Sequence, residues 1–402
     1  MSDPYNPAYA AVCLAVTLAV LRLVTGRGVR KTNPSRFDTI DGLRGYLAFF
    51  VFLHHSAFWY KYVKAGSWDV PPSHLFAHFG QSSVLFFFMI TGLLFFSKLR
   101  AGRRAPIDWL RLYVSRVLRL VPLYLFMLLL LYLIVGAETG FVRQEPVGVL
   151  ANEAIQWLSF CAFHSPSING FGATWLVTAG VTWSLTFEWL FYLSLPLLGA
   201  AIAPLRWVLF SAVTVLLFIF FREFYKTTVT FSFGSGIFAA MCAAKPGFQK
   251  FARSRWSTVF VLVPLAVAVI QFPVAYEWGP LFPYPADFYV LGLLTVAFVA
   301  IAAGNSVFGI LTHPLSKKLG DLSYGIYLLQ GIVLYVTFRF VVGTRHAASL
   351  SPPAYWGVIA IAGVCLTLLS LLMFRYLEHP CMLLVNGVTH RLRTLGRRSA
   401  RE

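Results

Sequence analysis

The stretch TIDGLRGYLAFFVFLHH, residues 39–55, is apolar enough to enter a lipid bilayer, yet it carries Arg44 and two histidines, His54 and His55. Ionisable groups inside a membrane are costly and usually mark function. Arg44 and His55 are eleven residues apart. At about 100° per residue this is three turns plus about 20°, so both side chains share one helix face, about 16 Å apart along the axis. His54 points about 100° away.

Two interpretations of this pair follow from the residues alone. In the first, Arg44 reaches the membrane surface with Asp41, three residues earlier, as its ion-pair partner, and His55 bonds to another helix. In the second, His55 is a general base, which requires that its proton affinity suit the working pH.

The composition of the chain predicts a multi-pass membrane protein. Its 402 residues are 58% hydrophobic and 17% aromatic, with a mean hydropathy of +0.72. Only 12% are charged, which is half of the roughly 25% usual in soluble domains. We therefore expect an all-α, polytopic helical bundle.

Eleven apolar runs are long enough to span a bilayer, which needs about 20 residues with a range of about 17–25. The first is followed by a basic loop, so we expect a retained helix rather than a cleaved leader. The runs are 8–24, 41–60, 82–98, 117–135, 184–200, 205–221, 228–244, 256–272, 286–304, 321–342 and 355–375.

The distribution of basic residues predicts the orientation. With the N-terminus outside and the C-terminus cytoplasmic, 26 of the 33 Lys and Arg residues fall on the inner side, as the positive-inside rule requires. This placement in the inner membrane accounts for the net charge of +18 without a nucleic-acid partner. The five cysteines show no zinc or redox spacing, and we expect no metal.

A cationic segment precedes the fourth run. Arg116 and Arg119 are three residues apart, so they share a helix face at its cytoplasmic end. Arg103 and Arg104 lie nearby. These residues are either topological anchors or a site for a phosphorylated ligand, since guanidinium groups match phosphate geometry.

Glu188 lies about one turn into an apolar run, near its outer end, and a carboxylate there needs a partner. Trp183, Ser184, Trp189 and Tyr192 are candidate donors. Before this run, residues 136–182 form the longest segment that we expect to be non-helical. Loops of this length are usually functional or disordered, and the aromatic residues favour function.

Weaker polar signals occur in three other runs. Thr91-Gly92 interrupts a Phe-rich helix, which is typical of close helix packing. Asp321 is a candidate helix cap, and Glu378 a candidate partner for an arginine. One polar stripe recurs every third residue, at Tyr324, Tyr327 and Gln330.

Together these stretches resemble the membrane-bound acyltransferase family 3 proteins over about residues 36–380. The order matches that family's Arg-x10-His motif, Phe-rich helix, Arg-x-x-Arg, Trp-Ser-Leu-x-x-Glu helix, Ser-Tyr-x-x-Tyr-Leu helix and Glu-x-Pro. The stretches are DGLRGYLAFFVFLHH, SVLFFFMITGLLFF, SRVLRLVPLY, WSLTFEWLFYLSLP, LGDLSYGIYLLQ and EHP.

The resemblance implies a membrane O-acyltransferase of the bacterial sugar type. Its donor would be cytoplasmic acetyl-CoA, with no metal, and its acceptor a hydroxyl of a surface polysaccharide, lipopolysaccharide or lipid-linked glycan. By position, His55, Arg44 and Glu188 would be catalytic, and Arg116 and Arg119 would bind CoA. Two departures are Thr91, where the family has Ser, and Gln330, where it has His.

We expect three regions: an extra helix and basic loop at 1–35, the acyltransferase domain at 36–380 and a loose basic tail at 381–402. CoA phosphates would bind at Arg116, Arg119 and the loop holding Arg103 and Arg104, with the pantetheine arm reaching toward His55. The 136–182 loop and Glu188 would form the acceptor side. Four residues would contact the sugar: Trp175, Trp183, Ser184 and Tyr192.

Several alternatives remain open. His55 takes the proton of the acceptor hydroxyl, or it first accepts the acetyl group itself. The acceptor is a glycan, or a small secondary metabolite. A proton-coupled transporter is the competing class, although the two halves of the chain show no repeat symmetry. A structural scaffold would leave the buried ionisable residues without purpose.

Overall fold

The computed structural model describes residues 3–26, 37–102, 107–161, 165–201, 227–271 and 285–399. Within these ranges every regular element is helical, which confirms the all-α prediction; the single β-bridge is isolated. Labels η1 and η2 mark 3₁₀ turns, and η3 and η4 mark π-helical turns. The elements are α1 (Pro7–Thr25), α2 (Asp38–Ala65), α3 (His74–Ala101), α4 (Trp109–Glu138), α5 (Val147–Leu158), α6 (Thr174–Val177), α7 (Trp183–Ala201), α9 (Thr227–Cys242), α10 (Pro246–Ala252), η1 (Trp256–Thr258), α11 (Val259–Gln271), α12 (Pro285–Ala302), η2 (Ile310–Thr312), α13 (Pro314–Asp321), α14 (Ser323–Val336), η3 (Thr337–Val341), α15 (Thr344–Ser349), α16 (Pro352–Met373), η4 (Phe374–Glu378), α17 (His379–Leu383) and α18 (Val385–Ser399).

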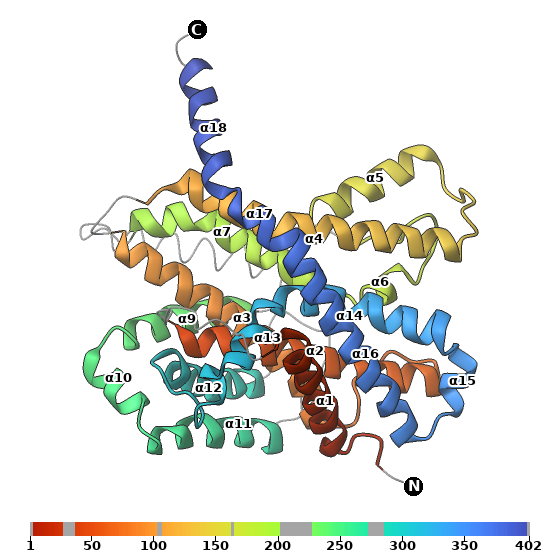
Figure 1. Cartoon of the computed structure of the whole chain (residues 1–402), viewed down its shortest axis with the longest axis horizontal. Coiled ribbons are helices and arrows are strands. Elements are labelled where there is room, and N and C mark those ends of the chain that lie inside the picture. Colours follow the sequence, from red (N-terminus) through yellow and green to blue (C-terminus); the bar gives the residue numbers. More distant parts are fainter. Residues whose placement is uncertain are drawn as a thin grey trace.

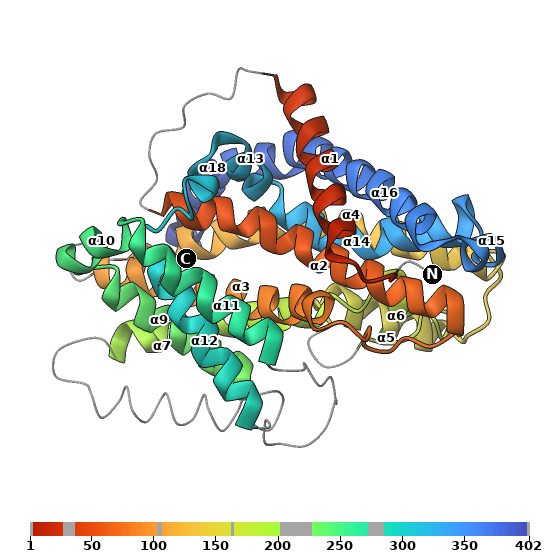
Figure 2. The ribbon, with the colours of Figure 1, turned by 90° about the horizontal axis from the view of Figure 1, so that it is seen from below.

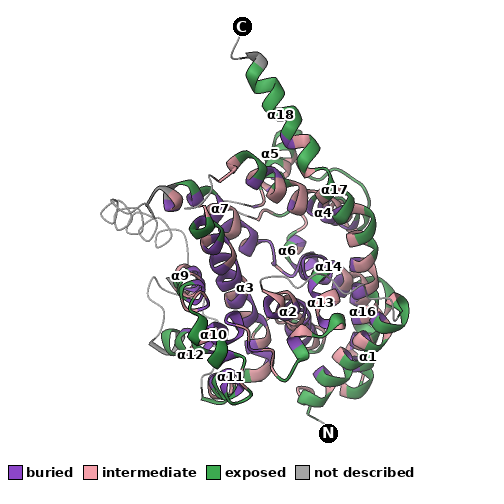
Figure 3. Ribbon diagram, turned by 60° about the vertical axis from the view of Figure 1, so that its left-hand side comes forward, coloured by how far each residue is buried: buried purple, intermediate pink, exposed green. Residues whose placement is uncertain are grey.

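Helix α2, which contains the opening stretch, lies inside the bundle and packs against α3, α13 and α14 (Figure 1). Helix α3 packs in turn on α9, and α12 joins α9 to α11. On the other side α14 contacts α16 and α4, while α1 packs along α16 (Figure 2). Buried residues gather on the inward faces of α2, α3 and α14, whereas α18 is largely exposed (Figure 3).

Two glycines explain how closely α2 and α13 approach each other. A Cβ atom at Gly45 would lie 2.6 Å from the backbone nitrogen of Gly320. A Cβ atom at Gly320 would collide with the carbonyl oxygen of Asp41. Small residues on both helices let the backbones touch. The backbone on either side of Arg44 is therefore fixed against the bundle.

Five helical segments in the described residues are long and apolar enough to cross a membrane. A sixth is added if the pair Pro246–Ala252 and Trp256–Gln271, bent by 84°, is one span. The five are Pro7–Thr25, His74–Ala101, Trp109–Glu138, Ser323–Val341 and Pro352–Arg397. These helices identify a membrane protein. The orientation and the count of eleven stay predictions, and the predicted run 205–221 lies outside the described residues.

The surface of α4 shows how a spanning helix divides its faces. Leu125, Leu129 and Leu133 recur every fourth residue, and each is about half exposed. Residues four apart stack on one face of a helix. An exposed stripe of leucines suits contact with lipid, while Leu123, Met127 and other buried residues of the same helix face the core.

Three expectations about local structure were wrong. The 136–182 segment contains helix α5 and the single turn α6. The tail is helical through Ser399, because α18 continues beyond α17 and contacts α4. Asp321 ends α13 rather than capping α14, whose N-cap position is Leu322.

In α5 the buried Glu153 accepts a hydrogen bond from the backbone nitrogen of Asn169, which fixes the helix to the following loop.

Candidate active site

A cavity of about 290 Å³ lies between α2, α3, α4, α7 and α14. It brings together six of the residues that sequence analysis singled out for chemistry. Its full lining is Asp41, Arg44, Val84, Phe87, Phe88, Ile90, Thr91, Leu94, Phe95, Arg116, Arg119, Leu120, Ser184, Leu185, Glu188, Tyr192, Ser323, Tyr324 and Tyr327. We call it the arginine cavity.

Three guanidinium groups give the arginine cavity its charge. Arg44 comes from α2, and Arg116 and Arg119 come from consecutive turns of α4. The guanidinium of Arg116 lies 5.3 Å from the ring centre of Phe95, within cation–π range. Arg119 interacts electrostatically with both other arginines. Like charges held this close favour a bound anion.

Glu188 lines the same cavity as the arginines. Its carboxylate accepts a very short hydrogen bond from the hydroxyl of Tyr192, one turn along α7. Tyr192 also interacts with Arg116. Glu188 therefore shares this cavity with the arginines, and its predicted place on the acceptor side stays a prediction. The hydroxyl of Tyr192 lies between the carboxylate and the guanidinium.

Glu378 is a buried carboxylate outside the cavity lining. Only 2% of it is exposed, and its Oε1 atom has no hydrogen-bond partner. It interacts electrostatically with Arg119 and Arg44, in keeping with the expected pairing to an arginine. A buried carboxylate next to guanidinium groups offsets part of their charge. The π-helical turn η4, which ends at Glu378, is a distortion common near functional sites.

A chain of polar contacts leads from the arginine cavity to His55. The hydroxyl groups of Ser184 and Tyr327 lie 2.7 Å apart at the cavity wall. The side-chain amide of Gln330 donates to the carbonyl oxygen of Tyr327 at 3.1 Å. Its Oε1 atom lies 3.4 Å from Nδ1 of His55. His55 is thus one turn of α14 beyond the cavity, behind Tyr327.

His55 also has aromatic neighbours. The ring of Trp68 lies nearly parallel to the imidazole, with centres 6.5 Å apart. Trp68 meets the partly exposed Trp175 edge-on, at 5.5 Å. Trp68 was not among the predicted site residues, because it lies in the short connection between α2 and α3 and carries no periodic signal. It joins Trp175 to His55.

His54 has a different environment from His55. Its Nδ1 atom bonds to the carbonyl oxygen of Phe76 at 2.7 Å, and the side chain is only 3% exposed. This bond ties α2 to α3. The structure therefore separates the two histidines as the helix geometry predicts, because His54 faces α3 while His55 faces α14.

The remaining predicted residues differ in whether they line the arginine cavity. Trp183 packs edge-on against the cavity residue Phe88, with ring centres 6.1 Å apart, but does not line the cavity itself. Thr91 lines it. Arg103 and Arg104 lie outside the described residues. Phe95 was not foreseen as an arginine contact, since a Phe-rich helix gives no sign of which ring meets a cation.

The fold and the cavity define a helical membrane protein with a buried cationic site. A family model described as an acyltransferase domain, that of acyltransferase family 3, matches residues 37–372. This match covers most of the chain, so the chain belongs to acyltransferase family 3 and is an acyltransferase. No curated protein and no solved structure in the comparisons matches it significantly.

Proposed function

We propose that the protein transfers an acetyl group from cytoplasmic acetyl-CoA to a sugar hydroxyl of a cell-surface polysaccharide, lipopolysaccharide or lipid-linked glycan, across the inner membrane. The observation that carries this proposal is the arginine cavity, which gathers Arg44, Arg116 and Arg119 and whose wall at Tyr327 is one turn of α14 from Gln330, the residue that contacts His55. Anions with several phosphate oxygens suit such a set of guanidinium groups.

The donor enters from the end of the cavity where α3 and α4 meet. Lys98 is exposed there and interacts electrostatically with Arg116 and Arg111, so positive charge continues from the surface into the cavity. CoA phosphates bind at this end. The pantetheine arm then runs along α14, past Tyr324 and Tyr327, and carries the thioester toward His55.

At His55 the acceptor oxygen attacks the thioester carbonyl and the carbon–sulfur bond breaks. His55 takes the hydroxyl proton and returns it to the CoA thiolate, or it carries the acetyl group first and the acceptor attacks in a second step. Trp68, beside His55, and Trp175, which packs against it, offer aromatic rings outside the lining of the arginine cavity. We place the sugar there.

The test is transfer of radiolabel from acetyl-CoA in membranes that contain the protein. We expect label on glycan or lipid-linked sugar, and none with His55→Ala. Label that stays on the protein when acceptor is withheld, and is absent in His55→Ala, identifies the covalent route. Label on a small apolar alcohol instead of a sugar would replace the proposed acceptor. The absence of any transfer from acetyl-CoA would end the proposal.

A further inference from the structure

Gln330 lies between the arginine cavity and His55. Its hydrogen-bond partners show which end of the side-chain amide is the nitrogen and which is the oxygen. The side chain is fully buried. The amide nitrogen and oxygen cannot be told apart by shape, so the hydrogen-bond network must decide. The carbonyl oxygen of Tyr327 can only accept, and it lies 3.1 Å from Nε2 of Gln330. The NH₂ group therefore faces Tyr327 and the oxygen faces His55.

This orientation determines which imidazole nitrogen holds the proton. Oε1 of Gln330 lies 3.4 Å from Nδ1 of His55 and has no proton to give. An oxygen acceptor at Nδ1 stabilises the tautomer with a proton on that atom. The lone pair is then on Nε2.

The position of Gln330 is fixed by the backbone next to it. A Cβ atom at Gly331 would collide with the backbone of Thr178. Helix α14 is thus pressed against the turn that follows α6 and cannot shift without losing that contact. The amide oxygen is consequently held in place as an acceptor for His55.

We infer that Gln330 is a positioning residue that holds His55 in the Nδ1-protonated tautomer, so that Nε2 acts on the acceptor hydroxyl or receives the acetyl group. The role of Nε2 rests on the proposed function; the tautomer does not. If Gln330 had only a structural role, its substitution would lower stability alone. If it positions His55, its substitution also changes the tautomer of His55 and the turnover number.

The direct experiment is ¹⁵N NMR of the full-length protein in detergent or nanodiscs with labelled histidine. The chain has nine histidines, and the His55 signals are assigned by their loss in His55→Ala. We expect wild type to show His55 with protonated Nδ1, and Gln330→Met to show a mixture of tautomers. Methionine approximates the length of glutamine without its acceptor. Wild-type His55 protonated on Nε2 would overturn the inference.

Kinetics supply the second readout. We expect Gln330→Met to lower kcat on the order of tenfold to a hundredfold, which is part of the 10²–10⁴ that a positioned base contributes, with KM for acetyl-CoA unchanged. Gln330→Glu keeps an acceptor and should restore activity. Its carboxylate stabilises the protonated imidazole, so the acidic limb of the pH–rate profile moves to higher pH.

Tyr335→Phe is the matched control on the same helix. Tyr335 bonds to Glu138 rather than to the site, and its loss should leave kcat and the pH profile unchanged. Wild-type kcat and an unshifted pH profile in both Gln330 variants would overturn the positioning role. If His55 has the expected tautomer but His55→Ala still transfers acetyl groups, the proposed function fails and the tautomer assignment stands.

Discussion

The hydroxyl groups of Ser184 and Tyr327 lie 2.7 Å apart and join α7 to α14 at the wall of the arginine cavity nearest His55. Tyr327 is the last residue of α14 to line the cavity before Gln330. Under the proposed function, a donor bound at the arginines passes this pair on its way to His55. Substitutions at the pair can then separate donor binding from acyl transfer.

Ser184→Leu should block the passage that the proposed donor route takes at this pair. We expect acetyl-CoA binding to persist, because the arginines are untouched, while the transfer rate falls on the order of a hundredfold through misplacement of the thioester. Binding of labelled donor and initial transfer rates measure the two effects. Ser184→Ala, which removes the hydroxyl but keeps the passage open, is the control and should remain within a few-fold of wild type. Normal transfer by the leucine variant would show that the donor takes another route.

Arg116→Ala and Arg119→Ala should each weaken acetyl-CoA binding by about tenfold to a hundredfold, as expected for loss of a charge-assisted hydrogen bond of about 1.5–3 kcal/mol. Equilibrium binding of labelled donor measures this. Arg345→Ala is the control, since Arg345 lies in α15, is exposed and is outside the cavity lining. Equal affinities in all three variants would leave Arg116 and Arg119 as anchors of membrane topology.

The two adjacent histidines should respond in opposite ways to alanine. His55→Ala should lower kcat by about 10²–10⁴-fold, the contribution of a positioned general base, with thermal stability retained. His54→Ala removes the buried side-chain hydrogen bond to the carbonyl oxygen of Phe76, which ties α2 to α3. It should cost about 1–3 kcal/mol of stability and little kcat per folded molecule. Melting curves and active-site-normalised rates separate the two. Equal loss of kcat in both would contradict the division of roles.

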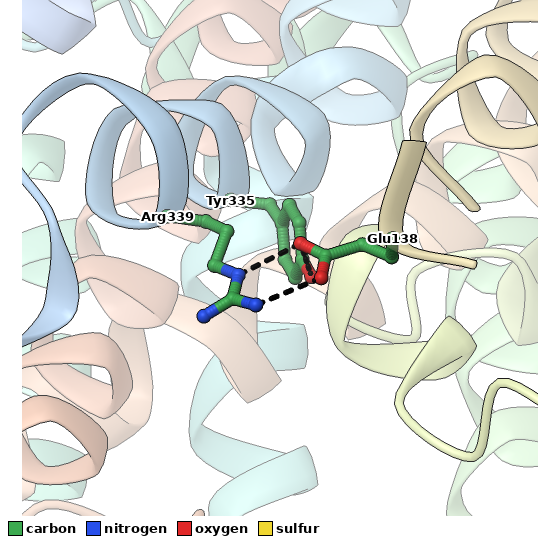
Figure 4. A network of polar contacts seen from close by, with 3 residues as sticks. All are labelled: Glu138, Tyr335 and Arg339. Carbon is green, nitrogen blue, oxygen red and sulfur yellow. Dashed lines mark hydrogen bonds and ion pairs between the residues drawn. The ribbon is translucent and has the colours of Figure 1, made fainter. Parts of the chain in front are cut away.

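A cluster of Glu138, Tyr335 and Arg339 at the C-terminal end of α4, which we call the clamp, should contribute to stability rather than to activity. Glu138 accepts bonds from both Nε and Nη2 of Arg339, at 2.7 and 2.8 Å, and from the hydroxyl of Tyr335 at 2.9 Å (Figure 4). Glu138→Gln removes the negative charge that binds both nitrogens of the Arg339 guanidinium. Because Arg339 is 48% exposed, we expect a loss of only about 1–2 kcal/mol, seen as a lower melting temperature.

Acetyl-CoA affinity should not change in the Glu138→Gln variant. Arg345→Ala, which removes an exposed arginine of α15, is the control and should leave the melting temperature unaltered. A fall in donor affinity with Glu138→Gln would mean that the clamp shapes the arginine cavity.

The basic helix α18 should be tethered by one carboxylate. Asp108 forms a short ion pair with Arg393 and accepts a hydrogen bond from the backbone nitrogen of Arg111. The backbone bond, followed by the bond to Arg393, lowers the pKa of Asp108 below 3.8. The tether is therefore fully present above about pH 4, and it is lost as the pH falls through the lowered pKa.

Asp108→Asn keeps the helix cap, since Asn caps as well as Asp, but removes the charge. At neutral pH we expect trypsin to cleave within α18 up to about fivefold faster, as befits an exposed ion pair. Cleavage at Lys64, far from this tether in the chain, serves as the internal control. An unchanged rate within α18 would show that its contacts with α4 hold it without the ion pair.

The amino-acid sequence by itself determined the class of the protein and much of the chemistry of its site. Apolar runs predict membrane helices because the cost of burying polar groups in lipid depends on composition alone. The spacing of Arg44 and His55 predicts a shared face because helix geometry is local. The motif order predicts the acyltransferase family, which the family model confirms. The roles of the individual site residues stay predictions.

Only the tertiary structure decided which residues meet. Glu188 joins Arg116 in one cavity, and Gln330 reaches His55, because packing sets how each helix is rotated and at what depth it contacts its neighbours. These pairs are separated by long stretches of chain, so no local rule relates them. Trp68 illustrates the same limit, since a connecting residue acquires its partners from contacts between distant helices.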